Sequence, residues 1–225
     1  MRLLATKIIT HQLKDRLIQN GYSLEEYPFI KTIPIEIKKY KLNKCLIFTS
    51  QNAVKYALNN DYLKQQFKDK KCFCVGEKTK SILEKNGLKV IKMSDNSAEL
   101  AFIISEKHKK DNFSFFCGNQ RRAEIEAVLK KTKITLDIHE IYNTLSNSKS
   151  IKTQFDGILF FSPSAVKSYF ESNDWNSYSH GFCIGTSTAE ILKRHTKKYS
   201  IAKSPSESQL LLSILNYETQ QHAQK

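Results

Sequence analysis

Arginine is scarce in this basic chain of 225 residues. Lysine and arginine together number 36 against 22 aspartates and glutamates, which leaves a formal net charge of +14. A charge of this size favours acidic partners such as nucleic acid, anionic lipid or a polycarboxylate. Only five of the basic residues are arginine, however, and arginine supplies the forked donors that suit guanine and phosphate. The shortage argues against a protein that recognises DNA bases.

Patterns typical of metal sites, membrane spans and secretion are missing as well. The five cysteines lie mostly in apolar runs, and the six histidines form no spacing with them that indicates zinc. No apolar run reaches the roughly 18 residues of a membrane span, and the first residues do not resemble a signal peptide. We therefore expect a soluble, cytoplasmic protein with reduced cysteines and no bound metal.

Common cofactor and hydrolase motifs are also absent from the sequence. The seven glycines form neither Gly-x-Gly-x-x-Gly nor Gly-x-x-x-x-Gly-Lys, so nicotinamide and nucleoside-triphosphate chemistry lack their motifs. No serine stands in Gly-x-Ser-x-Gly, the pattern of a serine hydrolase. We expect no cofactor.

The chain contains an internal repeat. Residues 48–55 match residues 160–167 at five of eight positions, and residues 73–79 match residues 182–188. A weaker match pairs 96–100 with 206–210, and both of these segments have the pattern of a helix capping box. The offsets all lie near 110 residues, so we infer two copies of one unit, far longer than a solenoid repeat.

Each copy alternates between two kinds of pattern. Helical patterns stop at Asn20-Gly21 and Asn86-Gly87. Between the helices lie short apolar runs typical of buried strands, at 2–5, 45–48, 72–75, 113–117, 157–161 and 182–184. This alternation predicts an α/β fold with two similar lobes, each a parallel sheet flanked by helices. The extended stretches 27–37 and 138–145 are the expected crossings between lobes, and the repeat leaves open whether a lobe equals one repeat.

Polar residues follow the predicted strands at equivalent places in both copies. Each copy has a serine after one strand and then a glycine and a threonine after the next: Ser50, Gly76 and Thr79, then Ser162, Gly185 and Thr188. Ligands of parallel sheets bind beyond the carboxyl ends of strands, and free amides at helix N-termini bind carboxylates or phosphates. Taken alone, each residue is better explained as a helix cap or a turn residue, and we expect Thr79 and Thr188 to begin the helices that follow. The repetition of the whole set in both copies favours an anion-binding site.

Two further features stand near predicted strand ends. The loop 118–122 holds the only arginine pair, Arg121 and Arg122, which could clamp a carboxylate or equally form a solvated first helical turn. Tyr142 lies in the second predicted crossing. It is a candidate proton donor, with simple packing and a hydrated hydroxyl as the alternative.

Six segments, in order, resemble the uroporphyrinogen-III synthase family, cofactor-free enzymes that close linear hydroxymethylbilane into the first cyclic tetrapyrrole. The matching segments are 47–54, 74–79, 116–122, 141–144, 160–166 and 184–189. The resemblance implies two α/β lobes joined by a two-stranded β linker, with the substrate in a cleft. One lobe would combine 1–29 with 146–225, the other would comprise 36–137, and 30–35 with 138–145 would form the linker.

The resemblance also implies roles for individual residues. Tyr142 matches the position most often given the role of acid for the departing hydroxyl. Positions that match substrate-binding residues are Ser50, Asn52, Gly76, Thr79, Gly118, Arg122, Ser162, Ser164, Ala165 and Thr188. Where the family usually has Thr-Arg-Pro, this chain has Thr6-Lys7-Ile8. The implied partners are hydroxymethylbilane and, transiently, the enzyme that makes it in the haem pathway.

Two other classes of function stay open. One is a non-enzymatic two-lobe module that binds an anionic small molecule, and the other is a basic nucleic-acid-binding protein. Lysine clusters at 68–71, 107–110, 130–133 and 193–198 support the latter, yet most lie near predicted helix ends, where lysine complements the helix dipole. We favour a lysine-rich solvated surface and expect neither a nucleic acid nor a membrane as partner.

Overall fold

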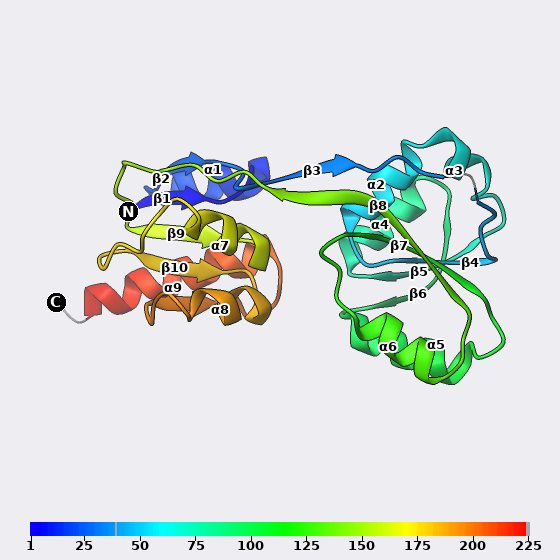
Figure 1. The fold of residues 1–225 in the computed structure, drawn as a ribbon. Helices are drawn as coiled ribbons and strands as arrows, with labels where there is room; N and C mark the ends of the chain where they lie inside the picture. The colour runs from blue at the N-terminus through cyan, green and yellow to red at the C-terminus, as the bar shows by residue number, and fades with distance from the viewer. Residues whose placement is uncertain (39, 224–225) are drawn as a thin grey trace. The chain divides into compact units, whose positions relative to one another are not determined.

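The computed structural model describes residues 1–38 and 40–223 and contains two compact units (Figure 1). Unit 1 comprises Met1–Lys31 and Leu145–Lys225, and unit 2 comprises Thr32–Thr144. The chain passes from one unit to the other within β3 (Ile30–Pro34) and again near the end of β8 (Leu136–Ser146). Of the two stretches predicted to link the lobes, 138–145 lies within β8, and 30–35 comprises β3 and the residue after it.

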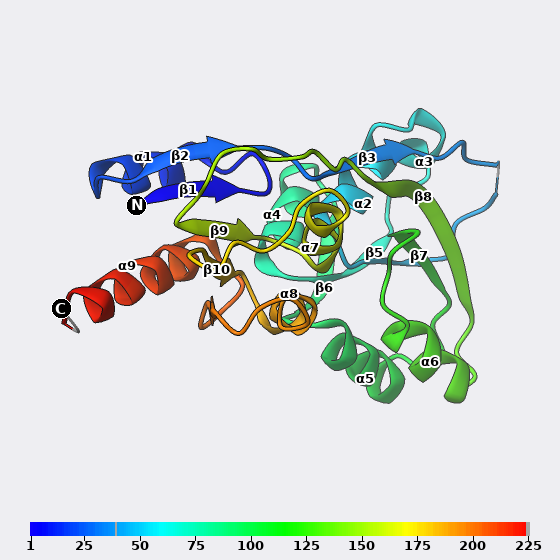
Figure 2. The same cartoon turned by 60° about the vertical axis from the view of Figure 1, so that its left-hand side comes forward.

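Unit 1 has a five-stranded sheet with the order β11-β10-β9-β1-β2, and each neighbouring pair is parallel. Helices α1 and α9 pack on one face through one apolar cluster, and α7 and α8 pack on the other through a second cluster. Figure 2 shows the same elements after a rotation of 60°. The strands are β1 (Arg2–Ala5), β2 (Ser23–Glu26), β9 (Gly157–Phe160), β10 (His180–Cys183) and β11 (Tyr199–Ile201), and the helices are α1 (His11–Gln19), α7 (Pro163–Phe170), α8 (Thr186–Leu192) and α9 (Glu207–Ala223).

Unit 2 has a six-stranded sheet with the order β3-β8-β7-β4-β5-β6, parallel at every pair from β8 to β6. Helices α2, α3 and α4 cover one face, and α5 and α6 cover the other. The remaining strands are β4 (Cys45–Phe48), β5 (Lys71–Val75), β6 (Lys89–Ser94) and β7 (Phe113–Gly118), and the helices are α2 (Gln51–Leu58), α3 (Asp61–Gln65), α4 (Glu77–Lys85), α5 (Ser97–Lys107) and α6 (Glu124–Lys131). The predicted α/β class with helix-flanked parallel sheets is confirmed.

The two units exchange pieces of the repeat, which answers the question that the repeat left open. Unit 1 joins β1, α1 and β2 from the first copy to β9 through α9 from the second copy. Unit 2 joins the rest of the first copy to β7, α6 and β8. Matched through the repeat, the order β11-β10-β9-β1-β2 corresponds to β6-β5-β4-β7-β8. The same sheet is thus built twice with different chain connections.

The helix starts follow mostly from local signals. Ser50 and Ser162 are N-caps, as predicted, and their hydroxyls accept hydrogen bonds from the amides of Ala53 (3.0 Å) and Ala165 (3.1 Å). The expectation that Thr79 and Thr188 open their helices is wrong. α4 begins at Glu77 and α8 at Thr186, because Gly76 and Gly185 are the caps, and each threonine is the third helical residue.

The sequence analysis did not predict four elements: the strands β2, β6 and β11 and the helix α3. All three strands lie at an edge of their sheet. An edge strand need not be apolar on both faces, and β2, with the sequence Ser-Leu-Glu-Glu, alternates between exposed and half-buried residues. None of the helices within residues 1–38 and 40–223 is long and apolar enough to cross a membrane.

Candidate functional site

Each sheet has a point from which the chain proceeds in opposite directions. In unit 1 this point lies between β1, which leads to β2, and β9, which leads to β10. In unit 2 it lies between β7, which leads to β8, and β4, which leads to β5. Ligands of open parallel sheets bind beyond the carboxyl ends of the strands at such a point. The two capping serines stand there, with Ser50 after β4 and Ser162 after β9.

In unit 2 the phenol of Tyr142 lies beside Ser50. The Tyr142 Oη and Ser50 Oγ atoms are 3.0 Å apart, within hydrogen-bonding distance. The cap of α2 therefore also holds the phenol. A register shift between Cys117 and Gly118 sets Tyr142 opposite Gly118 across β7 and β8. Such a bulge changes the direction of the side chains that follow it, and here it brings the tyrosine to the end of β7.

Gly118 leaves the space that the Tyr142 ring occupies. A Cβ atom at this position would lie 2.5 Å from the Cε2 and Cζ atoms of Tyr142 and 2.9 Å from its Oη. Carbon atoms in ordinary contact are about 3.5–4.0 Å apart. Only glycine at position 118 leaves room for the Tyr142 ring in this position, whether or not Gly118 itself contacts a ligand.

Tyr56 supports the other side of the phenol. Its ring stacks on that of Tyr142, with centroids 5.4 Å apart and planes inclined by 17°. The Tyr56 hydroxyl lies 2.8 Å from the carbonyl oxygen of Thr32, to which it donates, and 3.0 Å from Thr32 Oγ1. The sequence analysis missed Tyr56, since it lies inside α2 and belongs to no motif. Only the three-dimensional pairing with Tyr142 shows its place in the site.

Burial determines the protonation state of Tyr142. The residue is only 8% exposed, and burial raises the pKa of its phenol above the ordinary value of 10, while the hydrogen bond with Ser50 lowers it in part. The phenol is therefore protonated at neutral pH. It can act as a hydrogen-bond donor to an oxygen that gains negative charge.

In unit 1 the equivalent place holds Ser162 and Ser164, whose hydroxyl oxygens are 3.0 Å apart. The amide of Ala165 already donates to Ser162 Oγ, so it supports the cap. Lys7 follows β1, and its Nζ lies 2.7 Å from a carboxylate oxygen of Glu207 and 4.4 Å from the centroid of the Phe161 ring. Lys7 is thus held at this end of the sheet, with its charge balanced in part by Glu207.

The other predicted site residues differ in how accessible they are. Asn52 lies half-buried in the first turn of α2, and Gly76 has a positive φ of 83°, which favours glycine. The side chains of Thr79 and Thr188 are almost entirely buried, at 4% and 1% exposure. No hydrogen bond or ring contact joins these four residues to Tyr142 in the part of the chain that the structure describes.

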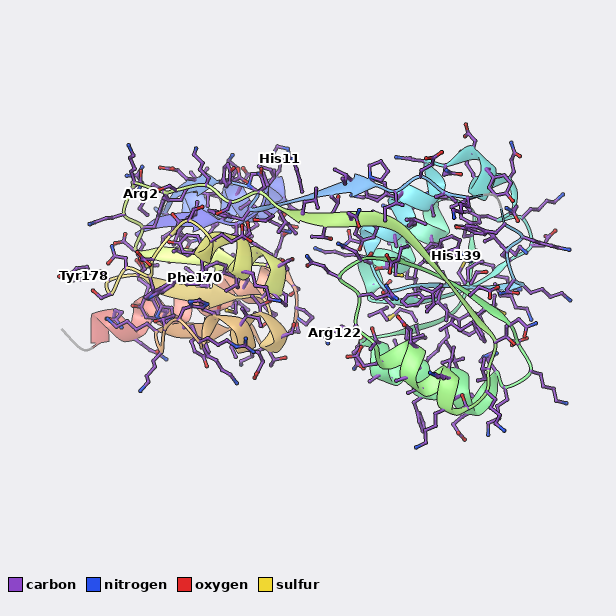
Figure 3. The ribbon with its side chains drawn as sticks, viewed as in Figure 1. Arg2, His11, Arg122, His139, Phe170 and Tyr178 are labelled. Atoms are coloured by element: carbon purple, nitrogen blue, oxygen red, sulfur yellow. The ribbon has the colours of Figure 1, made fainter. Side chains whose placement is uncertain are left out.

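The two arginines of the predicted clamp have different surroundings. Arg121 is paired with Glu126 and Glu140, and the hydrogen bond to Glu126 is the main reason that its pKa lies above its ordinary value. Arg122, labelled in Figure 3, is 57% exposed, and its nearest acidic partner is Glu124 at 3.7 Å. Arg122 is therefore the more exposed of the two arginines and the one with the weaker acidic contact.

Buried thiols and imidazoles add no reactive group to the site. Burial raises the pKa of the Cys117 thiol to about 12, so this cysteine, which lies next to Gly118, is protonated and a poor nucleophile. His139, labelled in Figure 3, is half-buried, and burial lowers its pKa, so the ring is neutral. Within residues 1–38 and 40–223, no three side chains of His, Cys, Asp or Glu are grouped so that they could hold a metal ion.

Comparison with known proteins gives a consistent result. A family model described as "Uroporphyrinogen-III synthase HemD" matches residues 11–211. A porphyrin biosynthesis protein HemD from Ruminiclostridium josui is 26% identical over an alignment of 251 positions, which covers 95% of this chain and 49% of that protein. The chain thus spans about half the length of this curated relative.

Solved structures show the same fold. The crystal structure of uroporphyrinogen-III synthetase from Helicobacter pylori is similar with a TM-score of 0.74 at 18% identity, over 96% of this chain and all of that chain. A mutant uroporphyrinogen III synthase from Thermus thermophilus is similar with a TM-score of 0.67 at 14% identity, over 98% of this chain and 99% of that chain. At these identities the likeness shows the fold alone.

Proposed function

Since the chain belongs to the uroporphyrinogen-III synthase family, enzymes of porphyrin biosynthesis, we propose that it cyclises hydroxymethylbilane to uroporphyrinogen III with loss of water and inversion of ring D. One observation on the structure carries the proposal. Tyr142, a protonated phenol, is held by Ser50 at the carboxyl end of β4, beside the glycine that leaves room for its ring. The matched family model supports the reaction class, and this arrangement supports the acid that the reaction needs.

The proposed reaction begins at the hydroxymethyl group of ring A. Its hydroxyl accepts a proton and leaves as water while the ring A nitrogen releases its own proton, so that ring A becomes a neutral, electrophilic azafulvene. Ring D attacks through its substituted carbon to form a spiro intermediate, which opens and recloses with ring D inverted. The bilane closes without inversion in the absence of enzyme, so the enzyme's main task is to orient the substrate, as positioning effects on rate allow. The reaction uses no cofactor.

Tyr142 acts in this scheme as a hydrogen-bond donor to the departing hydroxyl. The Ser50 hydroxyl already accepts from the amide of Ala53, and it can donate its own proton to the Tyr142 oxygen. The Tyr142 O–H then stays free to point at the substrate. Because burial raises the pKa of the phenol, stabilisation by a strong hydrogen bond is the expected mode, with the proton completing its transfer as water departs.

The substrate carries an acetate and a propionate on each of its four pyrrole rings, and the strand-end groups suit carboxylates. The first amides of α2 and α7, including those of Asn52 and Ser164, have no carbonyl partner within their helix and lie at the positive end of the helix dipole. We assign carboxylate binding to these amides and to the hydroxyl pair of Ser162 and Ser164. Ser50 contributes through the helix start that it caps, because its single hydroxyl proton is used for Tyr142. Further proposed contacts are Gly76, Thr79, Gly118, Arg122, Ala165 and Thr188.

The identity of the ring isomer tests this function. Purified protein supplied with freshly made hydroxymethylbilane is expected to yield the type III ring, which chromatography separates from type I. If well-folded protein yields only type I, the enzyme proposal fails and a module that binds an anionic small molecule becomes the better explanation. Retention of the protein on DNA at physiological ionic strength would instead support the nucleic-acid hypothesis.

A further inference from the structure

Eight lysines gather at the amino ends of β4, β5, β6 and β7 in unit 2, the edge of the sheet opposite Ser50 and Tyr142. They line two hollows of about 550 Å³ and 580 Å³. We call this surface the basic edge, and its lysines are Lys64, Lys68, Lys70, Lys71 and Lys89 in the first hollow and Lys41, Lys44 and Lys110 in the second. Neither hollow contains a residue of the proposed active site.

The two hollows adjoin each other. The backbone amide of Lys71, in the first hollow, donates to the carbonyl of Lys44, in the second (3.0 Å). The side chain of Lys70 donates across to the carbonyl of Leu42 (2.9 Å). Neighbouring strands lie about 4.8 Å apart, so the four strand ends carry the basic edge over roughly 15 Å. The lysines form a continuous elongated surface.

The charge of the basic edge is not balanced locally. Among residues 1–38 and 40–223, no ion pair involves any of these eight lysines. Of the acidic residues that the structure describes, only Asp69 and Asp111 line the hollows, and Asp111 already contacts His108 at 2.9 Å. Helices α2, α3 and α4 end at the first hollow and α5 ends just before the second, but each helix end carries only about half a unit of negative charge. Eight lysines exceed what the helix dipoles account for.

The shape and chemistry of the basic edge select one kind of ligand. A small anion needs charges that converge on one point, whereas these lie in a row. Proteins recognise or stack on nucleic-acid bases with arginine and with exposed aromatic rings. The basic edge has no arginine and its one aromatic residue, Phe67, is buried, so it offers phosphate contacts without any group that would contact a base. An extended polypeptide advances about 3.3 Å per residue, so about five acidic residues match the row. We propose that the basic edge binds an extended acidic segment on the surface of a partner protein.

Two variants of equal charge test this proposal with the full chain. The first replaces Lys44, Lys71 and Lys89 with glutamine, and the second replaces Lys152, Lys197 and Lys203 of unit 1 in the same way. All six side chains are exposed, and none makes an ion pair in the described part of the chain. Lys70 stays in place because it bonds to Leu42. The probe is a fluorescein-labelled hexaglutamate peptide, whose anisotropy reports binding at physiological salt.

We expect the first variant to bind the peptide about tenfold more weakly than the parent, the sum of three exposed ion pairs, and the second to bind within about twofold of it. Both variants should keep the parent's thermal midpoint and turnover, since the site lies at the other edge. Equal weakening in both variants would show that net charge alone attracts the peptide, and would overturn the proposal. The proposal would also be overturned if the parent bound an oligothymidylate of equal charge more tightly than the peptide, and if the first variant lost that binding.

Discussion

Replacing Gly118 with alanine perturbs the proposed site at a single point. The added Cβ would lie 2.5 Å from two ring carbons of Tyr142, so the ring must move by about 1 Å to reach an ordinary contact distance. The φ angle of Gly118 lies outside the left-handed region, so alanine fits the backbone itself. The three atoms nearest to the added Cβ all belong to the tyrosine, so the substitution acts chiefly through Tyr142.

The cost can be estimated from the structure. Forcing an extra methyl group into a packed site costs about 1–3 kcal/mol, and losing the bond between Ser50 and Tyr142 adds about 1 kcal/mol. We expect the Gly118→Ala variant to lose about 2–4 kcal/mol of unfolding free energy. Its turnover should fall at least tenfold, because the phenol no longer points where the cap of α2 holds it.

A double-mutant cycle measures whether the tyrosine is the cause. Gly118→Ala is made in the parent and in a Tyr142→Ala background, and the free energy of unfolding is measured with urea in all four proteins. With the ring removed, alanine at 118 should cost less than about 0.5 kcal/mol or be stabilising, as alanine restricts the unfolded chain more than glycine does. An equal cost in both backgrounds would refute the assignment of Gly118 to the support of Tyr142.

Three further predictions follow from the same arrangement. Tyr142→Phe should lower kcat at least tenfold with KM within about threefold, in steady-state assays with fresh bilane; a wild-type kcat would remove the phenol from the chemistry. Ser50→Ala and Ser162→Ala should each lower the unfolding free energy by about 1 kcal/mol, because each removes a helix cap. Only Ser50→Ala should also lower kcat, and equal losses of kcat in the two variants would contradict the role of Ser50 in holding Tyr142. Because burial raises the pKa of Tyr142, the phenol stays protonated as the pH rises through 10. The loss of kcat at alkaline pH should therefore lie above pH 10 in the wild type. A loss of kcat centred below pH 10 that is absent in Tyr142→Phe would oppose this assignment.

The helix caps at Ser50 and Ser162 could be predicted from sequence because capping is a local interaction. The serine bonds an amide three residues later, and the repeat showed the pattern twice. The buried strands were also predictable, since strands covered on both faces are apolar throughout, as in β4, where all four residues are buried. These features depend on only a few consecutive residues.

The arrangement around Tyr142 could not be predicted in this way. Tyr56 stacks on Tyr142 and is itself held by Thr32, so the contact depends on pairing between distant segments. The shift in register between β7 and β8 has no signature in the residues themselves. The repeat by itself did not indicate the exchange of pieces between the units, which only the family resemblance implied. Both possible connections bury the same apolar strands, so hydrophobic patterns do not distinguish them.

The isomers formed by matched concentrations of the wild type and of Tyr142→Phe test the central claim most directly. Both proteins receive freshly made hydroxymethylbilane, and the type III and type I rings are quantified over time, with a protein-free sample as the reference for unassisted closure. The account predicts mainly type III from the wild type, and in Tyr142→Phe a slower formation of type III with a larger share of type I. Wild-type protein that forms type I at the rate of the protein-free sample, and no type III, would contradict it.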